Sequence, residues 1–169
     1  MQMYMCSVCF QEYIDWEVDY KLEDGCLECS ASKEHLVPID ELILPVIQEL
    51  NYKGYTTLAC CAGHAYDGIP STYILFPIEI YSFLEGNFPK DFKIEVYEEK
   101  EGLRQVPSED GYRYEKNIVP AHFILRKYYG RASYENRPLL QHEIMKSLLK
   151  LYQWVKTLPR VKKESKVFN

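Results

Sequence analysis

Apolar and polar residues follow a helical spacing in the first half of the chain. Between residues 39 and 50 the apolar positions are 39, 42, 43, 46, 47 and 50, which lie on one face of a helix. This pattern predicts Asp40 as the N-cap and Gly54 as the stop signal. Pro45 removes a backbone hydrogen bond inside such a helix. Two alternatives therefore stay open, a helix kinked at Pro45 or one that begins near Leu44.

A second helical pattern lies near the end of the chain. It follows Asn136, has Pro138 in its first turn and ends before Pro159. Its apolar face is made of Leu140, Ile144, Leu148, Leu151, Val155 and Leu158. A shorter helix is predicted from Pro77 to about Leu84. The two patterns predict helices that each bury one face.

Strands are predicted where large apolar residues alternate with polar ones or where β-forming residues cluster. Such segments occur at 13–22, 55–60, 72–76, 92–97 and 121–128. The polar segment 98–117 contains the turn signal Glu109-Asp110-Gly111 and predicts a hairpin or a mobile loop. The resulting fold class is α/β (α+β): a small mixed sheet covered by helices, with a zinc-ribbon-like β unit at the N-terminus.

Four cysteines define this N-terminal unit. Cys6-x2-Cys9 is followed, after sixteen intervening residues, by Cys26-x2-Cys29. Two such turns together supply four thiolates in a tetrahedral shell, the arrangement that structural zinc prefers. An iron centre of rubredoxin type uses the same four ligands and is the competing metal. We expect two domains, a ribbon over residues 1–36 and an α/β domain over residues 37–169.

The loop Cys60-Cys61-Ala62-Gly63-His64 carries the second group of reactive side chains. Neighbouring residues of a strand point to opposite faces, so we expect Cys60 to be buried and Cys61 to be presented. Three interpretations of Cys61 and His64 stay open. They are ligands of a second metal completed by His122 or Asp67, a nucleophile and its base, or structural residues of a turn that needs glycine.

Basic and aromatic residues occur together in a second candidate surface, the segment Arg126-Lys127-Tyr128-Tyr129-Gly130-Arg131. Tyrosine can stack on nucleobases while cations hold phosphates. The predicted ligand-binding residues are therefore Cys61, Gly63, His64, Arg126 and Tyr128. With fifteen tyrosines in the chain, a cluster without a binding role is the alternative.

Charge is distributed unevenly, although the net charge is only −5. Residues 1–50 contain eleven acids and two bases, whereas residues 111–169 contain four acids and thirteen bases. The basic third could attract RNA or another acidic partner, or the two ends could neutralise each other. The chain lacks a secretory signal pattern and a membrane-length apolar run, and its thiols suit a reducing compartment, so a cytoplasmic protein is expected.

One stretch of the chain resembles uncharacterised bacterial and phage zinc-ribbon proteins with a Cys-Cys-x-Gly-His motif. It runs from Ile39 through Gly54-Tyr55 and Cys60-Cys61-Ala62-Gly63-His64 to Phe76. Over about forty residues it is also remotely similar to the wybutosine-synthesising protein 3 family. That family has a Ser-Ser-Cys-Ser-Gly-Arg motif here and methylates a tRNA guanosine with S-adenosylmethionine. Cys61 and Gly63 match its motif, while His64 replaces the arginine.

Taken together, these patterns predict a zinc-binding protein that acts as a ligand- or nucleic-acid-binding module. The first alternative is an RNA-modifying enzyme that uses S-adenosylmethionine, with its site at Cys61 and His64. A protein–protein adaptor with an acidic ribbon is the second alternative. The sequence leaves the oligomeric state open.

Overall fold

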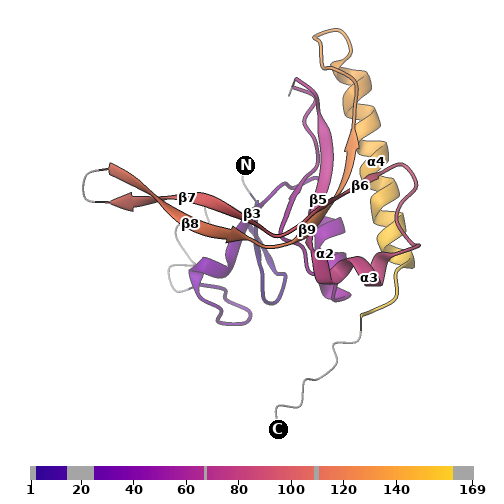
Figure 1. Ribbon diagram of the computed structural model, residues 1–169. Helices are drawn as coiled ribbons and strands as arrows, with labels where there is room; N and C mark the ends of the chain where they lie inside the picture. The colour runs from indigo at the N-terminus through magenta and orange to yellow at the C-terminus, as the bar shows by residue number, and fades with distance from the viewer. Residues whose placement is uncertain (1–2, 15–24, 67, 109–110, 162–169) are drawn as a thin grey trace.

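In the part of the chain that the structure describes, three antiparallel sheets and two main helices make up the fold (Figure 1). The computed structural model describes residues 3–14, 25–66, 68–108 and 111–161. Among them the predicted α+β class is confirmed. Every described strand pair is antiparallel, so the central sheet is not the mixed sheet that the sequence suggested.

The N-terminal sheet has the strand order β2-β1-β3. It contains β1 (Met3–Cys6), β2 (Glu12–Ile14) and β3 (Leu36–Ile39), with the 3-10 turn η1 (Lys33–His35) before β3. The strand predicted over residues 13–22 falls mostly outside the described residues. Met5 and Ile39 are buried in the core of the α/β part. Met5 of the predicted ribbon therefore packs into the main core, while Cys6, Tyr13, Cys26 and Leu36 form a second, smaller cluster.

The central sheet has the strand order β4-β5-β9-β6. Its strands are β4 (Ala59–Cys61), β5 (Ser71–Pro77), β9 (His122–Tyr128) and β6 (Lys93–Tyr97). In the two middle strands Ile74 pairs with Leu125 and Phe76 pairs with Phe123, and all four side chains are fully buried. The rings of Phe76 and Phe123 stack with centroids 5.0 Å apart. This face of the sheet is the centre of the core.

Two helices cover that face, and Figure 1 shows α4 running beside the central strands. They are α2 (Leu44–Tyr52) and α4 (Arg137–Thr157); the turn η2 (Ile78–Ile80) and α3 (Tyr81–Leu84) follow β5. Five residues of the apolar face predicted for α4, together with Leu158 just after it, are buried. The long C-terminal helix is confirmed.

The start of α2 corrects one prediction. Its N-cap is Ile43, not Asp40, and the helix begins at Leu44 with Pro45 in the first turn, where no hydrogen bond is lost. Gly54 ends the helix as predicted, with φ +94° and a hydrogen bond from the amide of Tyr55 to the carbonyl of Leu50. Asp40 is thereby available for another role.

Strand β4 is shorter than the predicted strand 55–60. The side chain of Tyr55 is buried and its hydroxyl donates to the carbonyl of Pro159. The amide of Thr57 donates to the side chain of Asn51, so these residues bond to helix α2 and to the chain after α4 rather than to β5. Pairing with β5 begins only near Leu58, whose amide donates to Leu75.

A hairpin extends away from the body of the molecule (Figure 1). It consists of β7 (Lys100–Ser108) and β8 (Gly111–Val119), which form their own two-stranded sheet. Of the two alternatives for residues 98–117, the hairpin is confirmed. None of the described helices has the length and apolar composition that crossing a bilayer requires.

Candidate metal centre and binding groove

The two Cys-x2-Cys segments fold into matching turns. In the first, the amide of Phe10 donates to the carbonyl of Cys6 at 2.9 Å; in the second, Ser30 donates to Cys26 at 2.9 Å. Phe10 and Ser30 both have positive φ, 66° and 58°, although neither is glycine. A left-handed residue directly after the second cysteine turns each chain back around its sulfur atoms. The repeated geometry places the two pairs of thiols opposite each other.

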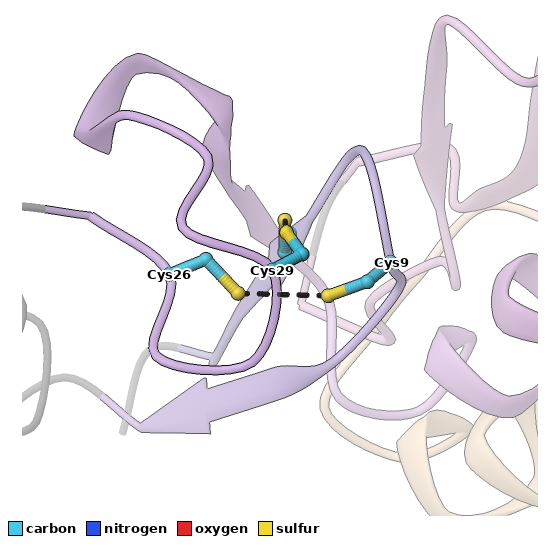
Figure 2. A group of neighbouring side chains, drawn as sticks. Cys9, Cys26 and Cys29 are labelled. Atoms are coloured by element: carbon cyan, nitrogen blue, oxygen red, sulfur yellow. Dashed lines mark hydrogen bonds between the residues drawn. The ribbon is translucent and has the colours of Figure 1, made fainter.

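The four sulfur atoms form one compact cluster. Cys6, Cys9, Cys26 and Cys29 each have their sulfur within 4.8 Å of the other three. The Sγ atoms of Cys9 and Cys26 are 3.5 Å apart and those of Cys6 and Cys29 are 3.7 Å apart, and Figure 2 shows Cys9 and Cys26 pointing toward each other. Zinc–sulfur bonds of about 2.3 Å give tetrahedral edges of about 3.8 Å. The cluster therefore has the dimensions that a four-coordinate metal ion needs.

Hydrogen bonds to two of the sulfur atoms favour the ionised, thiolate form of these cysteines. The amide of Val8 donates to Cys6 Sγ at 3.4 Å, and the Tyr13 hydroxyl lies 3.1 Å from Cys26 Sγ. Burial opposes ionisation of Cys26, but hydrogen bonds from Tyr13 and from the amides of Cys29 and Glu28 outweigh it and lower its pKa to about 6. Cys26 is thus the thiol of the cluster whose surroundings most favour the thiolate form.

The pKa of the neighbouring thiol, Cys9, shifts in the opposite direction. Burial, followed by hydrogen bonds with the other cysteines, raises the pKa of Cys9 to about 12. Four thiols this close cannot all ionise without a cation, because each thiolate repels the next. A bound divalent cation supplies that charge, and the cluster could hold one.

The central loop separates its two cysteines as predicted. Cys60 pairs with Ile74 and Cys61 with Tyr73, so their side chains are on opposite faces of the sheet. Cys60 packs against the hydrophobic core. Burial, with smaller contributions from Asp40 and Cys61, raises the pKa of Cys60 to about 12, which makes it a poor nucleophile.

Asp40 is the residue whose side chain lies beside those of Cys61 and His64. Donor atoms of the three side chains lie within 4.8 Å of one another. His64 Nε2 is 3.3 Å from Asp40 Oδ2. Of the two partners expected from the sequence, His122 lies elsewhere, stacked on Tyr97 at the far end of β9, and Asp67 lies outside the described residues. Spacing could not identify Asp40, because its position before α2 made it look like a helix cap.

A groove of about 660 Å³ opens between the N-terminal sheet and the edge of the central sheet. Its walls come from the N-terminal turns and β3, from α2, and from the segment before β4. They are lined by Met5, Ser7, Phe10, Val37, Pro38, Ile39, Asp40, Glu41, Ile47, Asn51, Thr56, Thr57, Leu58, Ala59, Cys60 and His64. The groove is therefore mainly apolar, with the carboxylates of Asp40 and Glu41 and the imidazole of His64 among its polar groups.

The predicted ligand residues Arg126 and Tyr128 lie on the outer face of the sheet. Cys61 pairs with Tyr73 and Tyr73 with Arg126, so the two predicted regions share this face. Arg126 is already engaged: it donates to the Tyr128 hydroxyl at 2.8 Å and lies 3.6 Å from Glu95. Neither Arg126 nor Tyr128 lines the groove.

Several bases of the C-terminal third pair with acids from earlier in the chain. Arg126 contacts Glu95, Lys150 contacts Asp91, and Lys156 lies 3.1 Å from Glu49. Of these pairs, Lys156–Glu49 joins the basic third to residues 1–50, whereas Glu95 and Asp91 belong to the middle of the chain. Neutralisation of one end by the other therefore stays a prediction.

Comparisons of the chain with models of protein families, with curated proteins and with solved structures find no match.

Proposed function

We propose that this protein is a binding module in which four cysteines hold one structural zinc ion and the groove binds a small, mainly apolar molecule. Four thiolates fill a tetrahedral shell, so the ion has no open position and serves the fold. Zinc suits this cluster because it prefers sulfur ligands and a tetrahedral shell, and the sulfur spacing of 3.5 and 3.7 Å agrees with that geometry.

The groove is the observation that carries the binding role. Ligand sites are concave, mainly apolar and supplied with a few polar groups that orient the ligand. Here apolar side chains such as Phe10, Ile47 and Leu58 line the groove together with Asp40 and His64, which lie next to each other. We expect the ligand to insert an apolar body and to direct a polar group at that carboxylate and imidazole.

Filling the groove tests this role. Thr56 lines the groove and is exposed, so Thr56→Trp places an indole there without disturbing the core. We expect the wild type to bind one Nile red molecule per chain with saturation, and Thr56→Trp to weaken that binding at least about tenfold, since the ring occupies the same volume. Fluorescence titration measures both affinities.

The matched control introduces the same side chain elsewhere. Met145 is an exposed residue of α4 outside the groove, and Met145→Trp should leave Nile red affinity unchanged. Equal binding by the wild type and both variants would contradict the proposal. S-adenosylmethionine, titrated in the same way, tests the enzyme alternative: saturable binding that His64→Ala abolishes would favour it.

RNA binding is a second candidate, favoured by the outer face of the central sheet. Antiparallel sheets with helices on one face can stack bases on aromatic residues of the other face. Tyr73, Tyr97 and Tyr128 lie on this face, two of them exposed, and Arg126 packs on the rings of Tyr73 and Tyr128 at 5.2 and 5.5 Å. This arrangement offers stacking surfaces around one cation.

Removing one ring tests the second candidate. If single-stranded RNA lies across this face, Tyr128→Ala should lower its affinity about tenfold, because a stacked base contributes about 1–3 kcal/mol. Tyr52 is exposed on helix α2, away from this face, so Tyr52→Ala is the control. Fluorescence anisotropy with labelled oligouridine at two salt concentrations gives the result. Binding that is absent, or equal in both variants, removes this candidate.

A further inference from the structure

We propose that Asp40, Cys61 and His64 form a second metal site, which holds a divalent transition metal through three protein ligands and leaves one position open. The four-cysteine ion is a separate centre. The inference goes beyond the proposed function, because it requires neither an occupied groove nor a particular groove ligand.

The spacing of the three donor atoms suits one ion. His64 Nε2 and Asp40 Oδ2 are 3.3 Å apart. Zinc bonds of about 2.0–2.1 Å to nitrogen and oxygen give a tetrahedral edge of about 3.3 Å. The Cys61 sulfur completes a group whose donor atoms all lie within 4.8 Å. The ligands therefore need little movement to share a cation.

Cys61 has the backbone environment of a metal-binding cysteine. The amide of Gly63 donates to Cys61 Sγ at 3.4 Å, and at the four-cysteine cluster the amide of Val8 donates to Cys6 Sγ at the same distance. In both cases the donor is the second residue after the cysteine. Such bonds stabilise a thiolate and orient its sulfur.

Two backbone amides also hold the carboxylate of Asp40 in place. The amide of Leu42 donates to its Oδ1 and the amide of Ala62 donates to its Oδ2, both at 3.1 Å. Supporting bonds of this kind orient ligating carboxylates. They come from two separate parts of the chain, the turn before α2 and the loop after β4, and so fix Asp40 beside Cys61.

An ion pair between Asp40 and His64 is the simpler alternative. The imidazole is 52% exposed, and pairs so open to water contribute little to stability. Such a pair also gives no reason for a sulfur atom and its amide donor to converge on the same point. A metal ion accounts for all three side chains together.

Three protein ligands are typical of catalytic zinc sites. In such sites water takes the fourth position, and the pKa of that water falls toward 7. Asp40 and His64 both line the groove, so a molecule bound there could reach the ion. The site would then suit a ligand with an oxygen or nitrogen atom that can replace the water.

Metal stoichiometry tests the site. The full chain, reduced and loaded with Co²⁺ or Zn²⁺ and freed of excess metal, should contain two ions per chain by elemental analysis. Cys61→Ser with His64→Ala should contain one. Cys60→Ser, which changes the adjacent thiol on the other face of the sheet, should keep two. Thermal melting confirms that the variants are folded. One ion in the wild type at saturating metal overturns the proposal.

Two further measurements separate the open site from its alternatives. Azide should change the visible spectrum of the Co²⁺ protein but not that of the double variant, because four thiolates leave no position for it. No change in the protein that holds two Co²⁺ ions would show that the second site is closed. Zn²⁺ should also slow alkylation of Cys61 by iodoacetamide; fast alkylation that zinc does not slow would identify a nucleophile and contradict the metal site.

Discussion

Replacing Cys26 by serine is expected to release the ion from the four-cysteine cluster and to destabilise the whole chain. Cys26 is buried and is the thiol whose pKa is lowered, to about 6, so it is the ligand best prepared for the metal. Loss of a structural metal is among the changes that cost more than about 4 kcal/mol. Urea unfolding followed by circular dichroism, together with zinc analysis, measures the effect.

The loss should reach beyond the N-terminal sheet because two residues of that sheet pack into the main core. Met5 and Ile39 flank the cluster on β1 and β3, yet they pack with residues of the α/β part. Once the ion is lost, we expect the small cluster of Cys6, Tyr13, Cys26 and Leu36 to loosen together with β1 and β3, and the apolar side chains on the far side of the groove to become exposed. We therefore expect one unfolding transition at lower urea concentration, not a stable α/β remainder.

Cys60→Ser is the control for this experiment. It makes the same chemical change at a partly buried cysteine outside the four-cysteine cluster. We expect it to lower the free energy of unfolding by less than about 2 kcal/mol and to retain the ion of the four-cysteine cluster. A Cys26→Ser protein with wild-type stability and full zinc content would contradict the role assigned to the cluster.

The sequence predicted the parts of the protein that depend on local spacing. The two Cys-x2-Cys turns, the apolar face of the helix after Asn136 and the hairpin at residues 98–117 are each encoded within one continuous segment. Gly54 ends α2 because its positive φ is a local requirement as well. In each case the signal and the structure that it specifies occupy the same short segment.

Long-range contacts explain what the sequence did not reveal. Asp40 comes 21 residues before Cys61, and only the packing of β3 and the loop after β4 brings them together. The groove likewise exists because the N-terminal sheet docks against the edge of the central sheet. Strand β4 was predicted too long because Tyr55 and Thr57 bond to groups on other elements. No periodicity within one segment reports such contacts.

Gly63→Ala is expected to lower the free energy of unfolding by about 2–3 kcal/mol and to abolish the second metal site. Gly63 has φ +88°, and a Cβ atom there would lie 3.2 Å from the backbone of Ser71 and 3.3 Å from the hydroxyl of Thr72. That hydroxyl is buried and donates to Ala62, so it cannot easily move away. The loop must shift, and Cys61 and His64 would separate.

Gly68→Ala in the same loop is the matched control. No heavy atom lies within 4 Å of its added Cβ, so the stability of this variant should stay within about 0.5 kcal/mol of the wild type, with both metal ions retained. Urea unfolding and metal analysis of the pair then separate two roles of Gly63. Lower stability with two ions retained would mean that the glycine serves only the fold. Lower stability with one ion would mean that its left-handed turn also brings Cys61 and His64 to the same ion.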